Sequence, residues 1–290
     1  MKYPQWIVIA LALLGSLGLY FFGQRKPTNV DSAEGVSPHA SAKSGMNPFE
    51  AKPKSNLNIE DSLEMFRQLL TDSQRDSLKI LEKNFAESIP DKAIASEKLA
   101  KAWRSWRSPE LASYYQMAFA QFKNDEDAWR LGADEAFIAM KMTPDTSWKN
   151  YFADKAIQGY EKTLSFAPAN LDYKVTLAEC FVEGKGAVMK GVTMLREVTA
   201  VDSTHTAANL LLGKLAISSS QFDKAAQRLE KLAAREPKNS EALYYLGEAY
   251  LGLGRNEEAV RVFEECKKIV GNPAFAKELD AYIRKNINKP

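Results

Sequence analysis

The chain has little histidine, little cysteine and almost no charge imbalance. Two histidines and two cysteines in 290 residues argue against His-based metal centres and His-based catalytic triads. Basic and acidic residues number 39 and 37, so the charge footprint of a nucleic-acid-binding protein is missing. Gly184-Lys185-Gly186 resembles part of a phosphate loop, but the further glycine and the Ser/Thr of that motif are missing. We therefore expect no enzyme activity, no cofactor, no metal ion, no nucleic acid and no small-molecule substrate.

What the sequence does contain is a period close to 34 residues. Four small residues stand 35, 34 and 34 positions apart: Ala156, Gly191, Ala225 and Ala259. A large apolar residue follows each of them four positions later: Tyr160, Leu195, Leu229 and Phe263. A fixed period of this length is typical of helix–turn–helix solenoids, which present binding surfaces and carry out no chemistry of their own.

The best two units share a detailed pattern. The unit 240–273 carries Leu246-Gly247, Tyr250, Gly254, Ala259 and Phe263, and the unit 206–239 carries Leu212-Gly213, Ala225, Leu229 and Pro237. These residues resemble the tetratricopeptide repeat (TPR), closely over 206–273, fairly over 150–205 and only in general helical character over 59–149. The resemblance implies an all-α fold, a right-handed superhelical α-solenoid of helix–turn–helix repeats.

The pattern divides the chain into five regions. They are a transmembrane anchor at 1–23, a flexible linker at 24–57, a divergent helical, TPR-like region at 58–149, repeats at 150–170, 171–205, 206–239 and 240–273, and a capping helix at 274–290.

Some positions depart from the repeat pattern or mark helix starts. Pro90 and Ser108-Pro109-Glu110 are expected to start helices in the divergent region, because proline and acidic residues suit the first turn. The stretch Asp125–Met142 is expected to pair with the helix around Ala156, across a loop at 143–148 that is longer than the family spacing. The unit 171–205 has one extra residue, placed within the turn 183–186. Cys180 and Cys266 lie two units apart, which favours two buried small side chains over a disulfide.

The first residues contain a run without charge from Trp6 to Phe22. Its length is near the lower limit for crossing a bilayer, about 17 residues, and we expect an uncleaved single-pass anchor in a bacterial-type inner membrane. The alternative is a cleaved signal peptide with Ser16 and Gly18 at the cleavage site. The repeat domain is expected on the extracytoplasmic, periplasmic side.

The resemblance also implies a binding groove, lined by the second, fifth, ninth and twelfth positions of each first helix. In this sequence the candidate partner-binding residues are Asp172, Val175, Glu179, Leu210, Lys214, Ile217, Glu241, Tyr244, Glu248 and Leu251. They are apolar with an acidic bias, so we expect a protein or peptide partner with apolar anchors and Lys/Arg side chains. An alternative is that the chain's own linker or a self-contact fills the groove.

Two functions fit this reading. The first is a membrane-tethered scaffold or adaptor that binds protein or peptide partners through its repeats. The alternative is a non-catalytic accessory subunit of an envelope or cytochrome c biogenesis system, in which membrane-bound proteins of this family occur.

Overall fold

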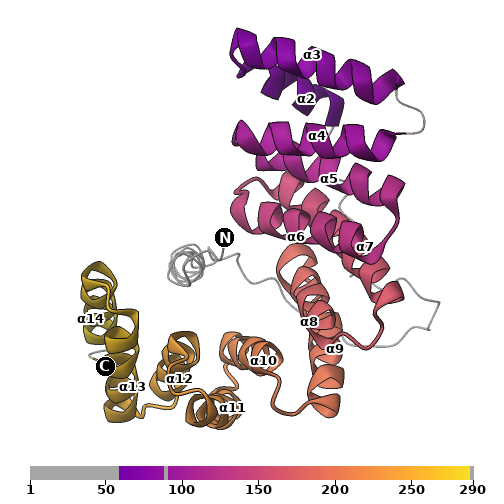
Figure 1. The fold of residues 1–290 in the computed structure, drawn as a ribbon. Coiled ribbons are helices and arrows are strands. Elements are labelled where there is room, and N and C mark those ends of the chain that lie inside the picture. Colours follow the sequence, from indigo (N-terminus) through magenta and orange to yellow (C-terminus); the bar gives the residue numbers. More distant parts are fainter. Residues whose placement is uncertain (1–58, 88–90, 288–290) are drawn as a thin grey trace, which may run out of the picture.

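A computed structural model describes residues 59–87 and 91–287, and this part of the chain is built of helices joined by short turns. The helices pair into antiparallel hairpins that stack on one another (Figure 1). The predicted all-α solenoid is therefore confirmed. The proposed anchor and linker lie outside the described residues.

The first helices are α2 (Ile59–Gln68), α3 (Asp72–Glu87), α4 (Lys92–Ser105) and α5 (Pro109–Lys123). Helix α5 starts as expected, with Ser108 as its N-cap residue and Pro109 in its first turn. Helix α4 starts two residues later than predicted, at Lys92 with Asp91 as its N-cap, and Pro90 is outside the described residues. Trp103 of α4 is fully buried and its ring meets Trp106 edge to face at 5.1 Å.

Helices α6 (Glu126–Met142) and α7 (Thr146–Phe166) form the next hairpin. The predicted long loop at 143–148 is wrong, because α7 starts at Thr146 and only residues 143–145 separate the two helices. Asp145 causes the early start: its side chain accepts a hydrogen bond from the Trp148 backbone N–H at 2.9 Å. Trp148 then stacks on Phe152, with 5.2 Å between ring centroids. The additional residues lengthen α7 to 21 residues.

The third hairpin contains the extra residue of the 35-residue unit. Helix α8 (Leu171–Glu179) continues directly into a π-helix, η1 (Cys180–Gly184), before α9 (Val188–Val201) returns. A π-turn holds one more residue than an α-turn, and such insertions kink helices. The extra residue is therefore absorbed inside the helix, upstream of most of the predicted turn. Gly184 allows a close approach here, since a Cβ at this position would lie 2.5 Å from Ala153 Cβ of α7.

The last helices follow the predicted register. They are α10 (Thr206–Ser218), α11 (Phe222–Arg235), α12 (Ser240–Gly252), α13 (Asn256–Val270) and α14 (Pro273–Ile287). Ala225 and Ala259 are fully buried at the helix contacts, as the period predicts. Leu279 and Ile283 of α14 join the same core, so α14 covers the end of the stack.

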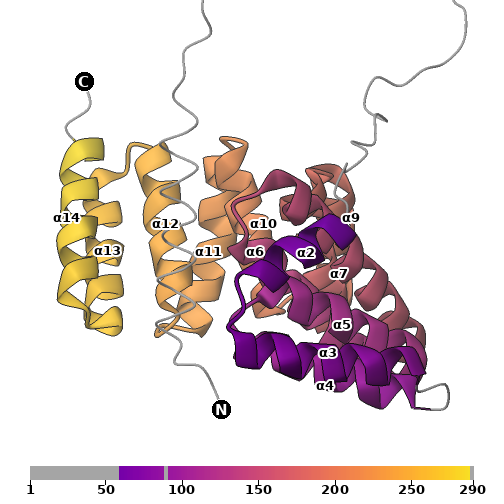
Figure 2. The same cartoon turned by 90° about the horizontal axis from the view of Figure 1, so that it is seen from above.

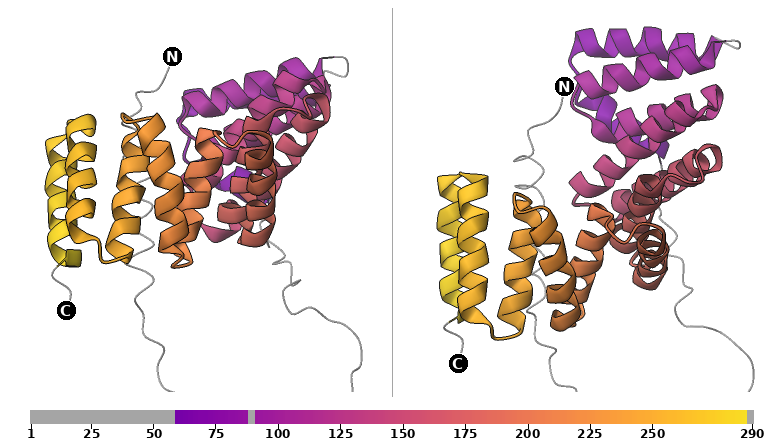
Figure 3. Two further views of the ribbon diagram at one scale, coloured as in Figure 1. Left: turned by 90° about the horizontal axis from the view of Figure 1, so that it is seen from below. Right: turned by 60° about the horizontal axis from the view of Figure 1, so that its bottom comes forward.

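The stack changes direction near its middle. Helices α3–α7 form one part and α10–α14 another, and α8, η1 and α9 lie between them (Figure 1). Seen from above, α11–α14 stand nearly parallel while α3–α5 run across them (Figure 2). The views of Figure 3 show the same change. The π-helix η1 belongs to this middle part of the stack, between α8 and α9.

The expectation of a single-pass membrane protein with a periplasmic repeat domain is corrected. In residues 59–87 and 91–287 no helix is both long enough and apolar enough to traverse a bilayer. The run from Trp6 to Phe22, on which that expectation depended, lies outside the part of the chain that the structure describes.

Candidate functional site

The ten predicted binding residues come from α8, α10 and α12, the first helices of three successive hairpins. Two of them belong to the core: Val175 is 4% exposed and Tyr244 is 8% exposed. The Tyr244 ring packs edge to face on Phe263 of α13, with 5.7 Å between centroids. Leu210, Ile217 and Leu251 are partly buried against the same core cluster as Tyr244, whereas Val175 belongs to the cluster formed by α8, α9 and α10. These side chains form the apolar floor of the face.

Asp172 lies apart from the other polar members of the set. Its Oδ1 is 3.2 Å from Nε2 of His205. His205 is the N-cap residue of α10, where its Nδ1 accepts from the Ala208 backbone N–H at 3.5 Å. This histidine therefore has a structural role at the turn before α10, and Asp172 serves the same turn.

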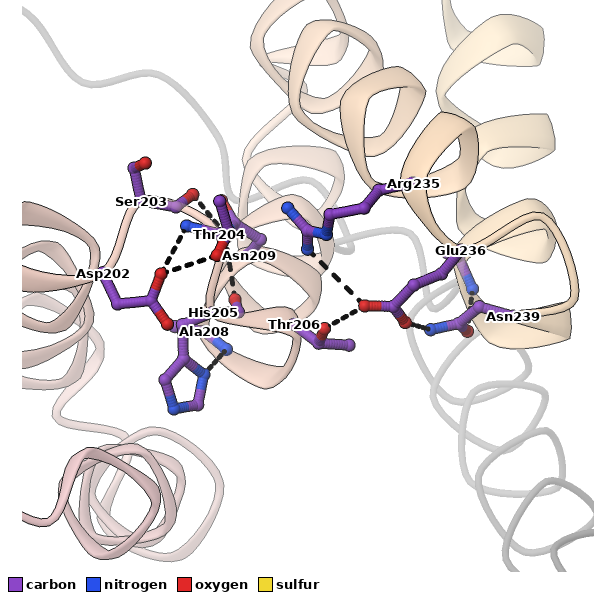
Figure 4. A network of polar contacts seen from close by, with 11 residues as sticks. Asp202, Ser203, Thr204, His205, Thr206, Ala208, Asn209, Arg235, Glu236 and Asn239 are labelled. Carbon is purple, nitrogen blue, oxygen red and sulfur yellow. Dashed lines mark hydrogen bonds and ion pairs between the residues drawn. The ribbon is translucent and has the colours of Figure 1, made fainter.

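The turns before α10 and α12 are connected by polar contacts (Figure 4). Asn209 donates to the backbone oxygens of Ser203 and His205, at 3.0 and 2.9 Å. Across to the next repeat, Thr206 donates to Glu236, which also accepts from Asn239 at 3.0 Å. These contacts fix the spacing of successive hairpins and so the spacing of the side chains on the neighbouring face.

Glu179 shares a lysine with a residue that the sequence analysis did not select. Lys141 Nζ, in the last turn of α6, lies 2.8 Å from Glu179 Oε1 and 2.5 Å from Glu183 Oε2 of η1. Burial disfavours the Lys141 ammonium, but the two carboxylates outweigh this and raise its pKa. Burial opposes the Glu183 carboxylate, yet attraction to Lys141 lowers the pKa of Glu183. Lys141 and Glu183 are therefore both charged at neutral pH.

A second ion pair of the face lies closer to α12 and joins Lys214 of α10 to Glu241 of α12. Lys214 Nζ is 3.9 Å from Glu241 Oε1 and 5.3 Å from the ring centroid of Tyr245. Burial raises the pKa of Glu241; Lys214 opposes this rise, while Glu179 and Glu183 add to it. Burial raises the pKa of the Tyr245 hydroxyl, and the charges of four glutamates raise it further: Glu241, Glu183, Glu248 and Glu179. Carboxylates from α8, η1 and α12 therefore act on one small region, which we call the ionic cluster: Lys141, Glu179, Glu183, Lys214, Glu241 and Tyr245.

Glu248 lies at the C-terminal side of the ionic cluster. Its Oε2 accepts a hydrogen bond from the Tyr282 hydroxyl of α14 at 2.9 Å, while its Oε1 is buried without a partner among the described residues. Desolvation raises the pKa of Glu248 to about 7, against a smaller opposing effect of the Tyr282 hydrogen bond. Glu248 therefore connects the face to the terminal helix.

Sequence reasoning missed Lys141, Glu183 and Tyr245. Glu183 stands four residues after Glu179, so a shared helix face was a usable signal. Tyr245 follows the selected Tyr244 directly in the sequence, and the two side chains have different neighbours because of the way α12 packs on α13. Lys141 had no local signal, because its contacts are 38 and 42 residues away and depend on the full length of α6.

The fold and this face define a helical-repeat solenoid in which partly buried charged side chains from successive hairpins lie close together. Residues 210–269 match the family model of the tetratricopeptide repeat. The matched residues run from α10 to α13 and are the part of the chain that the family model identifies as tetratricopeptide repeats. No curated protein matches the chain.

Three solved structures illustrate what this chain is similar to in fold. The crystal structure of MamA is 17% identical, with a TM-score of 0.46, over 64% of this chain and 96% of that chain. YrrB, described as a TPR protein with an unusual peptide-binding site, is 17% identical with a TM-score of 0.43, over 69% and 97%. A thermophilic TPR protein of Thermus thermophilus is 17% identical with a TM-score of 0.48, over 66% and 98%.

Proposed function

We propose that this chain is a non-catalytic scaffold that binds a segment of a partner protein along the face formed by α8, η1, α10 and α12. The observation that carries the proposal is the imbalance of charge on that face. Three glutamates, Glu179, Glu183 and Glu241, stand against two lysines, Lys141 and Lys214. Solenoids present such extended faces to their partners.

The apolar floor indicates a second property of the partner, which is apolar side chains beside its basic ones. Its partly buried members Leu210, Ile217 and Leu251 lie on α10 and α12, the helices that also carry Lys214 and Glu241. A partner segment with apolar anchors and Lys or Arg side chains would cover the floor and neutralise the excess carboxylates. An acidic segment would meet repulsion from the same carboxylates.

Glu241→Lys is the best test, because Glu241 is partly exposed and makes only a long ion pair with Lys214. Tyr244 and Glu248 are poorer choices, since Tyr244 packs on Phe263 in the core and Glu248 holds the Tyr282 hydroxyl of α14, so their replacement would disturb folding. Glu265→Lys on α13 is the matched control: it makes the same charge change at an exposed position on a second helix.

The measurement is binding to an array of synthetic peptides that are basic, acidic or neutral, each with and without leucine and phenylalanine anchors. We expect wild type and Glu265→Lys to retain the basic peptides with anchors, and more weakly as salt is added. We expect Glu241→Lys to lose them. An array pattern that is the same for Glu241→Lys and wild type would refute the proposed face.

A further inference from the structure

Lys141 differs from every other member of the ionic cluster in its origin. It belongs to the last turn of α6, in the first part of the stack, whereas its two carboxylates belong to α8 and η1 at the change of direction. Lys214, by contrast, is on α10, one of the helices that form the face. Lys141 thus brings a cation into the face from a different hairpin.

The Glu179–Glu183 pair is filled by this one ammonium. Both contacts are within 3 Å, at 2.8 and 2.5 Å, and the three side chains are between 23% and 38% exposed. An ammonium or guanidinium from another molecule would need the same two carboxylates and the same space. A partly exposed ion pair in such a position is weak enough for another cation to compete with it.

Lys141 also lies near an aromatic ring. Its Nζ lies 5.6 Å from the ring centroid of Phe137, one turn earlier on α6. When its carboxylates are taken, the ammonium can turn into water, because the Lys141 side chain is already 38% exposed. The incoming cation loses water while the Lys141 ammonium regains it, so the two desolvation terms of the exchange largely cancel.

We propose that Lys141 is an internal competitor that occupies the Glu179–Glu183 pair until a basic side chain of the partner replaces it. The inference rests on the proposed function and adds its regulation: the face selects partners whose cations outcompete Lys141. Segments with several Lys or Arg side chains are favoured over those with one. Removing Lys141 should therefore strengthen binding, whereas the loss of a residue that only supports the fold would weaken it.

The test uses the full chain and acetylated, amidated octalysine with a fluorescent label, at low salt. Three variants are compared with wild type: Lys141→Gln, Lys141→Arg and Lys149→Gln. Lys149, on α7, is the matched control, because it acts on Glu183 by Coulombic attraction and, in the described part of the chain, without an ion pair. We expect Lys141→Gln to bind octalysine about three- to tenfold more tightly, Lys149→Gln less than about twofold, and Lys141→Arg like wild type.

A second arm needs no substitution. Limited acetylation of wild type, read by mass spectrometry, should modify Lys141 slowly alone and faster with octalysine present, while Lys149 changes little. Either of two results would refute the role of Lys141 and leave the proposed face untouched. One is equal affinity of Lys141→Gln and Lys149→Gln for octalysine, and the other is an acetylation rate of Lys141 that octalysine does not raise. If octalysine binds neither wild type nor Lys141→Gln, the proposed face fails as well.

Discussion

At the scale of single residues, the repeats depend on places where one helix leaves room for a side chain of the next. A Cβ added at Gly247 would lie 2.5 Å from Phe263 Cε1, and one added at Gly213 would lie 2.9 Å from Leu229. Phe263 and Leu229 are themselves fully buried. These glycines are therefore required by the approach of the neighbouring side chain, within helices that would otherwise favour alanine.

Gly247→Ala should destabilise the protein. The exchange gains about 1 kcal/mol of helix propensity, but the new methyl group overlaps the Phe263 ring, and overpacking of this kind costs about 1–3 kcal/mol. We expect a net loss, seen as a lower urea midpoint. The exposed Gln227→Ala on α11 is the control and should change stability by less than about 0.5 kcal/mol. A midpoint that rises in Gly247→Ala would contradict the close contact.

Glu248 should make stability depend on pH. Its pKa is raised to about 7 from an ordinary 4.5, so the folded state holds a proton that the unfolded state releases. Its contribution is complete below about pH 4.5 and disappears as the pH rises through 7, an effect of up to about 3 kcal/mol.

Urea unfolding at pH 5 and pH 8 measures this effect. Wild type should lose more stability between the two values than Glu248→Gln, which keeps a neutral acceptor for Tyr282 at both. Other carboxylates titrate in both proteins, so the difference between them isolates Glu248. An identical pH dependence in the two proteins would show that burial does not raise the pKa of the Glu248 carboxyl.

At the scale of helices, the sequence could predict the elements whose signals are local. Ala225 and Ala259 have their large partners four residues away, and α11 and α13 follow from that spacing alone. Cys180 and Cys266 are buried free thiols, as their places in the pattern predict. Helix α7 is longer than predicted, because Asp145 caps a helix where the sequence analysis expected a loop, and that prediction was wrong.

The candidate site was less predictable than the fold. The register selected Glu179, Lys214 and Glu241, which do act on one another. It could not select Lys141, whose approach depends on how two hairpins are placed in space. The π-helix was equally out of reach, because an extra residue can be absorbed either in a turn or within a helix, and packing of Gly184 on Ala153 decides between them.

Helix α14 should loosen when its contact with α12 is cut. Tyr282→Phe removes the hydroxyl that donates to Glu248, and a buried carboxylate that loses a donor costs about 1–3 kcal/mol. The Lys267–Asp280 ion pair between α13 and α14 remains in the variant. We expect faster hydrogen exchange in α14 with little change in α10. Tyr173→Phe, which removes a longer hydroxyl contact to Glu126 on α6, is the control and should leave α14 unchanged.

At the scale of the whole molecule, the buried residues fall into clusters that follow the chain. One cluster joins residues from α11 to α14, and another joins residues from α2 to α5, with no shared member. Successive hairpins contact their neighbours, so stability is passed along the stack by nearest-neighbour contacts. Local damage should therefore stay local over several hairpins.

Ala259→Leu tests this property of the whole stack. Ala259 is fully buried between α12 and α13, and the larger side chain should cost about 1–3 kcal/mol by overpacking. In hydrogen exchange read by mass spectrometry, we expect protection to fall in α12, α13 and α14, fall less in α10 and α11, and stay as in wild type in α3, α4 and α5. The graded loss is the signature of nearest-neighbour coupling. Equal loss of protection in α4 and α13 would instead mean that the stack opens as one cooperative unit.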